Sequence, residues 1–154
     1  MKFNIQFDGF FEMQNIRKQI QTWIKDNDLE IKEQKEKVKP DSYQLKLKLS
    51  RSYTDYAKIE GEINLSIQNL KDARIRKNNE EKDIQTGYLE MLVDLDKKID
   101  EEKPFKEKSD KINGILKNTF KDLIDDEKDY LDEEVNRMIQ EIREKISTAL
   151  QLYN

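Results

Sequence analysis

The chain has 154 residues, with 29 basic and 33 acidic side chains, a net charge of −4, and neither histidine nor cysteine. This composition excludes disulfides, thiolate chemistry, a histidine general base and the common zinc sites, and no cofactor is expected. The charges are interleaved along the sequence, so the extended basic surface that nucleic acid requires is not expected either.

The N-terminal part predicts a strand followed by a helix. Apolar residues alternate with polar ones over 3–7, which is typical of a strand, and the turn residues Asp8-Gly9 are expected to end it. Over 13–24 the apolar residues follow helical spacing, with Trp23 on the apolar face. There is no apolar signal core and no apolar run of about 20 residues that could cross a bilayer, so a cytoplasmic protein without a transmembrane segment is expected.

Three further segments are predicted to be strands. Residues 29–39 are rich in lysine and run into Pro40, as in an edge strand protected from further pairing. Residues 43–53 and 57–68 are apolar on one face only and are joined by a short link, so we expect them to form a hairpin. Gly61, on the apolar face, indicates a bulge or a place where a helix or ligand approaches the backbone closely.

The C-terminal third changes its period. Residues 77–82 are very polar and predict an exposed loop, and 87–96 alternate again as a last strand. Beyond Pro104 the apolar residues come at every third or fourth position, which predicts a helical arm. The acidic triplet 125–127 interrupts the apolar stripe of this arm.

A single helix along the whole arm would be about 70 Å long, more than one small sheet can cover. We therefore expect two helical segments, roughly 105–124 and 127–151, with a hinge at the acidic triplet. Together the elements predict an α+β fold, in which one short helix and a long C-terminal helical arm pack on one face of an antiparallel sheet of five or six strands. The expected domain is 1–154, made of a sheet part (1–103) and the arm (104–154).

Several short motifs carry a resemblance. The Trp-ended first helix, Lys37-Val38-Lys39-Pro40, Lys103-Pro104-Phe105 and Asp129-Tyr130-Leu131 occur in an order that resembles a group of small uncharacterised archaeal proteins. No activity is implied by that resemblance. The order of strand, helix, strands and long helix is also similar to the helix-grip (START-like) fold, which implies an apolar ligand cavity between sheet and C-terminal helix. The chain differs from that fold in having a single helix after the first strand and a longer arm.

Two non-catalytic functions follow as hypotheses, with an enzyme as a third. The first is a binder of an apolar small molecule or lipid in a groove between sheet and helix. The residues expected to line this groove are Trp23, Ile63, Met91 and Phe120. The alternative is a protein–protein interaction module that acts through the apolar stripe of its arm. A homodimer is one form that this module could take. This stripe consists of Val135, Met138, Ile142 and Ile146.

The remaining polar constellations favour ordinary surfaces. Asp94 and Asp96 have the D-x-D spacing of a magnesium site, yet a solvated strand face opposite apolar residues explains them better. The only local basic excess lies within 71–77, and the acidic pair at 80–81 follows at once. No metal site and no catalytic residue are expected.

Overall fold

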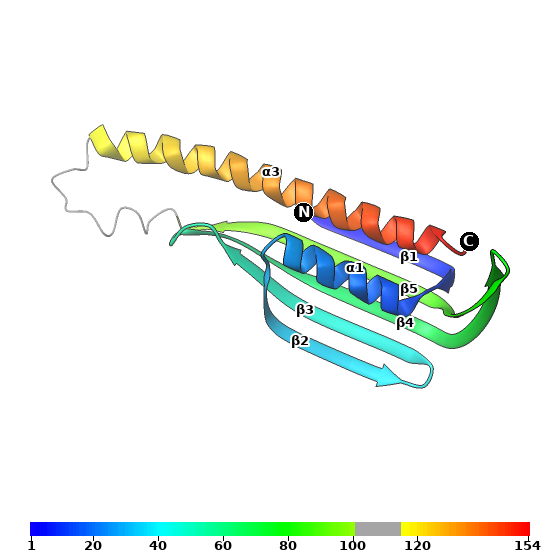
Figure 1. The fold of residues 1–154 in the computed structure, drawn as a ribbon. Coiled ribbons are helices and arrows are strands. Elements are labelled where there is room, and N and C mark those ends of the chain that lie inside the picture. The colour runs from blue at the N-terminus through cyan, green and yellow to red at the C-terminus, as the bar shows by residue number, and fades with distance from the viewer. Residues whose placement is uncertain (101–114) are drawn as a thin grey trace.

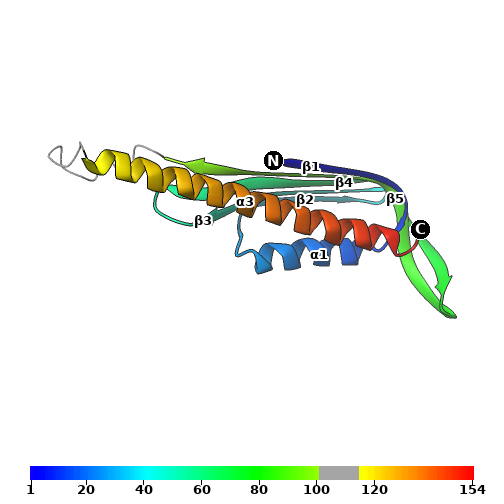
Figure 2. The ribbon, with the colours of Figure 1, turned by 90° about the horizontal axis from the view of Figure 1, so that it is seen from above.

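The computed structural model describes residues 1–100 and 115–154, except for the side chains of 115–120. The elements in chain order are β1 (Lys2–Phe11), α1 (Met13–Asp26), β2 (Glu30–Lys39), β3 (Ser42–Ser52), β4 (Ala57–Lys77), β5 (Glu80–Ile99) and α3 (Ile115–Gln151). The strands form one five-stranded sheet in the order β1-β5-β4-β3-β2, and all neighbours are antiparallel. Figures 1 and 2 show both helices on the same side of this sheet. The predicted α+β fold class is confirmed.

Alternation places the apolar side chains in rows across the strands. One row runs from Phe3 on β1 through Val93 and Ile63 to Leu47 on β3, and each of these side chains is buried. The next position in the row is Gln34 on β2, where the apolar row ends. No residue of β2 is buried, and β2 is the last strand of the sheet, so the prediction of a lysine-rich edge strand is confirmed.

The helices close the core over this face. The apolar stripe of α1 is buried, as the helical spacing predicts, and consists of Ile16, Ile20, Trp23 and Ile24. The C-terminal two-thirds of α3 bury Leu131, Val135, Met138, Ile139, Ile142, Ile146, Ala149 and Leu150. These side chains and those of the sheet belong to one hydrophobic cluster. Each large apolar side chain in it contributes about 1.5–3 kcal/mol of transfer free energy.

The hinge predicted at the acidic triplet is wrong, because α3 runs without a break from Ile115 to Gln151. Backbone hydrogen bonds hold a helix through a turn that lacks apolar contacts, so an interrupted stripe need not end it. The hydroxyl of Tyr56 also donates to Glu127 Oε2 at 3.0 Å, which ties the triplet to the end of the sheet. The first turns of α3 extend past the sheet (Figure 1), so the sheet does not have to cover the whole helix. The predicted start at 105 lies outside the described residues.

The loop predicted at 77–82 is also wrong, because β4 and β5 continue as a long hairpin. Asn78 and Asn79 have φ values of 53° and 64°, the left-handed pair that a two-residue type I′ turn requires. The segment is polar because both faces of this hairpin lie beyond most of the core. A register shift between Gln68 and Lys71 marks an irregularity at its base, and Figure 2 shows the tip curving toward the helical side.

Two glycine positions also differ from expectation. β1 does not end at Asp8-Gly9 but continues to Phe11. At Gly61 the close neighbour is strand β5, since a Cβ there would collide with the Asp94 carbonyl oxygen and the Leu95 side chain.

In the described part of the chain, no helix is both long and apolar enough to cross a membrane.

Candidate functional site

The residues expected to line an apolar groove lie inside the core. Trp23, Ile63 and Met91 are each 0% exposed and belong to the same hydrophobic cluster. The side chain of Phe120 lies outside the description. Trp23 is further held by its indole N–H, which donates to the Met138 carbonyl oxygen at 2.9 Å. An apolar ligand at these residues would have to displace packed side chains.

The apolar stripe of the arm is also occupied within the chain. Exposure is at most 5% for the four residues Val135, Met138, Ile142 and Ile146. These side chains pack in the same cluster as α1 and the sheet. A partner could reach them only if α3 left the sheet, so in this conformation the stripe is core and not a contact surface.

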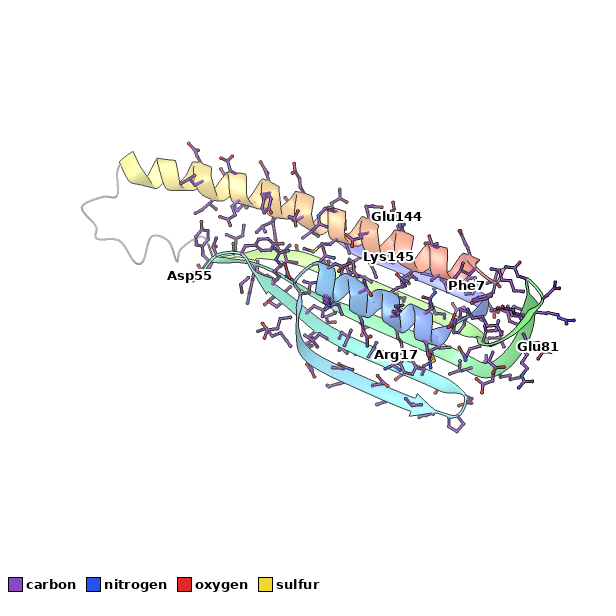
Figure 3. All side chains as sticks on the ribbon, viewed as in Figure 1. Phe7, Arg17, Asp55, Glu81, Glu144 and Lys145 are labelled. Atoms are coloured by element: carbon purple, nitrogen blue, oxygen red, sulfur yellow. The ribbon has the colours of Figure 1, made fainter. Side chains whose placement is uncertain are left out.

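Another group of side chains gathers where β3 and α1 end and α3 passes over them. We call it the Tyr–Arg patch, and it consists of Arg51, Tyr53, Tyr56, Tyr130 and Arg137. It lies at the end of the sheet marked by Asp55 in Figure 3. The chain has only six tyrosines, and three of them belong to this patch.

Asn27, just after α1, organises the two arginines. Its side chain is 2% exposed and donates from Nδ2 to the Trp23 carbonyl oxygen at 2.8 Å. Arg137 Nη2 donates to Asn27 Oδ1, and Arg51 Nη1 donates to the Asn27 carbonyl oxygen, both at 3.1 Å. Positive charge at this point also complements the negative end of the α1 dipole.

Two aromatic rings of the patch are in contact with each other, and one of them is also in contact with an arginine. Tyr53 and Tyr130 meet edge to face, with centroids 6.1 Å apart and planes at 80°. The guanidinium carbon of Arg51 lies 4.5 Å from the centroid of Tyr53. Tyr130 is 51% exposed, and Leu123, seven residues earlier on the same helical face, is 53% exposed.

One polar group in the patch lacks a well-formed hydrogen bond. The hydroxyl of Tyr53 is buried and has no partner of good hydrogen-bond geometry among the described residues, although the Glu134 carboxylate lies near enough to interact with it. Its burial raises the pKa of Tyr53, so the hydroxyl stays neutral at physiological pH. A buried hydroxyl of this kind lowers the free energy of unfolding by about 1–3 kcal/mol unless an acceptor or donor reaches it.

The charged side chains of the patch form ion pairs that stay ionised at neutral pH. Arg137 donates to Glu134 at 2.9 Å and to Glu141 at 3.2 Å. The hydrogen bond from Arg137 lowers the pKa of Glu134, which is therefore ionised at neutral pH. A fixed ion pair beside neutral phenols suits recognition of another surface better than proton transfer.

The sequence analysis missed this patch. Its residues come from three separate segments, and neither helical nor strand periodicity connects them. The one available signal was scarcity: the chain has six arginines against a far larger number of lysines, and two of them meet here. Scarcity alone does not place residues side by side.

Comparison with known proteins finds no matching family model, no matching curated protein and no matching solved structure. The class of the protein therefore follows from its own geometry. It is an α+β domain with an open antiparallel sheet, two helices on one face and a Tyr–Arg patch at one end of the described part.

Proposed function

We propose that this chain is a non-catalytic protein–protein interaction module and that the Tyr–Arg patch is its contact surface. Tyrosine and arginine are the residue types most enriched at the energetic centres of protein interfaces, because they combine large apolar area with polar tips. Lysine, which dominates elsewhere in this chain, is depleted at such centres.

The observation that carries the proposal is that contacts within the chain hold these half-exposed side chains. Arg137 is 49% exposed and yet bound to both Asn27 and Glu134. Tyr130, also half-exposed, is held against Tyr53. Side chains already ordered before binding lose little conformational entropy on contact, so more of their interaction energy is available as affinity.

The proposal keeps the arm as the interacting element but changes the surface used. Tyr130 and Arg137 are on α3, as the arm hypothesis requires, whereas the buried stripe serves the core. The first hypothesis, an apolar ligand between sheet and helix, stays a prediction. It would require side chains such as Trp23 to move, and native mass spectrometry of the purified protein would detect a copurified ligand.

Photo-cross-linking in a cell extract tests the interaction proposal. The wild-type protein is compared with Tyr130→Ala/Arg137→Ala and with a control, Val38→Ala/Arg76→Ala, which removes an exposed apolar residue and an exposed arginine elsewhere. We expect specific proteins to be captured by wild type and control and reduced about tenfold in the patch variant, as for the loss of one strong anchor. Capture that is equal for all three proteins, or absent for all three, contradicts the proposal.

A further inference from the structure

The two edge strands of the sheet differ in how they are protected from further pairing. β2 is rich in lysine, its register shifts between Ile31 and Glu33, and Pro40 follows it. Lysine, bulges and proline are the features with which proteins blunt an edge strand. β1, the outermost strand on the other side (Figure 1), has no register shift over its ten residues, no proline, and lysine only at Lys2. The β1 edge is therefore regular and lacks these protections.

Hydrogen bonds at its two ends show which main-chain groups of β1 point away from the sheet. Met1 exchanges hydrogen bonds with Leu95 on β5, at 2.6 and 2.9 Å. The N–H and carbonyl oxygen of Phe10 instead bond to the side chain of Asn154, at 3.1 and 2.7 Å. Because this direction alternates along an antiparallel strand, odd-numbered residues face β5 and even-numbered residues face outward. The outward-facing positions before Phe10 are all exposed and consist of Lys2, Asn4, Gln6 and Asp8.

The side chain of Asn154 shows what this edge binds. Its amide donates to and accepts from the same residue, Phe10, as a residue of a neighbouring strand would. The last pairing position of the edge is thus filled within the chain. In the described part of the chain, β1 has no second neighbouring strand that could pair with the four positions before it.

The apolar side of the edge is also incompletely covered. Ile5 and Phe7 are only partly buried, although they pack against the hydrophobic cluster. Their neighbours across β5, Met91 and Leu89, are completely buried. One further strand beside β1 would complete both the main-chain pairing and the burial of these apolar rows.

The sequence of β1 is complementary to itself in one register. Outward-facing residues must lie opposite outward-facing residues for main-chain hydrogen bonds to form. When a second β1 runs antiparallel with Ile5 opposite Ile5, Lys2 lies opposite Asp8. Asn4 then lies opposite Gln6, and on the apolar side Phe3 lies opposite Phe7. A shift by two residues in either direction loses the match between Lys2 and Asp8.

We propose that a second copy of the chain pairs with β1 in this register, about a two-fold axis that passes between the two Ile5 residues. The two sheets join into one continuous antiparallel sheet with all helices on the same side. Each outward-facing position from Lys2 to Asp8 exchanges two main-chain hydrogen bonds with the other copy. The contact is isologous and closed, so it stops at a dimer. It shares no residue with the Tyr–Arg patch and does not depend on the function proposed for it.

Sedimentation velocity over a concentration series tests the proposal in wild type. We expect a monomer–dimer equilibrium that changes little with salt, because main-chain hydrogen bonds and apolar contacts dominate the joint. A protein that stays monomeric up to millimolar concentration overturns the proposal and leaves the edge to an extended segment of another protein. A dimer that dissociates on addition of salt would indicate charged surfaces and also overturn it.

Two variants at the same positions test the register. Asn4→Lys/Gln6→Lys places lysine opposite lysine at both sites of the joint and should weaken the dimer about tenfold or more. Asn4→Lys/Gln6→Glu places opposite charges at both sites and should strengthen it. Both positions lie on the exposed face of β1, and circular dichroism confirms that the variants are folded. Equal dimer affinity of the two variants overturns the proposal.

Disulfide formation locates the axis, because the chain has no cysteine of its own. In the proposed register the Cα atoms of the two Ile5 residues lie about 4.5 Å apart, so Ile5→Cys should form a covalent dimer on oxidation. The two Phe7 residues would lie about 13 Å apart along the strands, so Phe7→Cys should not. Val38→Cys, on the exposed β2 edge, measures random collision. Oxidation of Ile5→Cys no faster than Val38→Cys, or equal cross-linking of Phe7→Cys, overturns the proposal.

Discussion

The indole N–H of Trp23 donates to the main-chain carbonyl oxygen of Met138 at 2.9 Å, within the core and across 115 residues of sequence. The sequence predicts that Trp23 contacts a ligand and that Met138 contacts a partner. The hydrogen bond joins α1 to α3 instead, and both side chains are completely buried. The apolar stripes of α1 and α3, each a candidate binding surface from the sequence, therefore pack in the same core.

Replacing Trp23 with phenylalanine should lower the free energy of unfolding by about 1–3 kcal/mol, because the hydrogen bond is lost and a small cavity remains. Urea denaturation measures the change. Val38→Ala, at a residue that is 70% exposed, is the control and should stay within about 0.5 kcal/mol of wild type. Equal stability of the two variants would show that the bond between α1 and α3 contributes nothing.

Ile63→Asp should prevent folding, since it places an unpaired carboxylate in the middle of a buried apolar row. Glu62→Lys, at the adjacent position on the face of the sheet away from the helices, should change stability by less than about 0.5 kcal/mol. Urea melts compare the two variants. Similar damage from both substitutions would contradict the observed register.

Asn27→Ala should destabilise the protein by about 1–3 kcal/mol, because Asn27 is buried and satisfies both the end of α1 and Arg137. It should also weaken the Tyr–Arg patch by releasing the Arg137 side chain. Asn64→Ala, on the face of the sheet away from the helices, is the matched control. Thermal melts report the first effect, and the cross-linking yield of the folded variant reports the second.

Tyr43→Phe should leave stability at neutral pH unchanged or raise it by up to about 1 kcal/mol, because the buried Tyr43 hydroxyl makes no hydrogen bond of good geometry among the described residues, although Glu36 lies near enough to interact with it. Burial raises the pKa of Tyr43 to about 12. The folded state therefore favours the neutral phenol.

This contribution is complete below the unfolded pKa of about 10 and is lost as the pH rises from there toward 12. Tyr43→Phe should therefore lose less stability than wild type over that range. Urea melts at several alkaline pH values measure it, and parallel curves for the two proteins would contradict the assignment.

Hydrogen exchange should divide α3 into two parts in spite of its unbroken helix. Residues 131–150 carry the buried stripe and should exchange as slowly as the strand around Ile63. Residues 121–126 lie before the contact between Tyr56 and Glu127 and should exchange faster. Uniform protection along the helix would show that its first turns are held as firmly as the core.

The local periodicity of the chain determined most of its elements. Alternation in 43–53 and 57–68 predicts strands whose buried face the structure confirms, and lysine in 29–39 predicts the edge. Periodicity failed where contacts from other elements decide the outcome. The polar segment at 77–82 pairs as a hairpin because of its Asn78-Asn79 turn, and α3 passes its acidic triplet because helical hydrogen bonds are local.

The sequence by itself determined which side chains are apolar on each element, because a strand and a helix repeat with fixed periods. Only the tertiary structure decided that β1 lies beside β5, and that Arg51, Tyr130 and Arg137 meet around Asn27. The reason is that a period describes one element, whereas a site made from β3, α1 and α3 depends on how distant segments pack. Burial of the two apolar stripes brought these segments together, and the polar side chains at their ends were placed as a consequence.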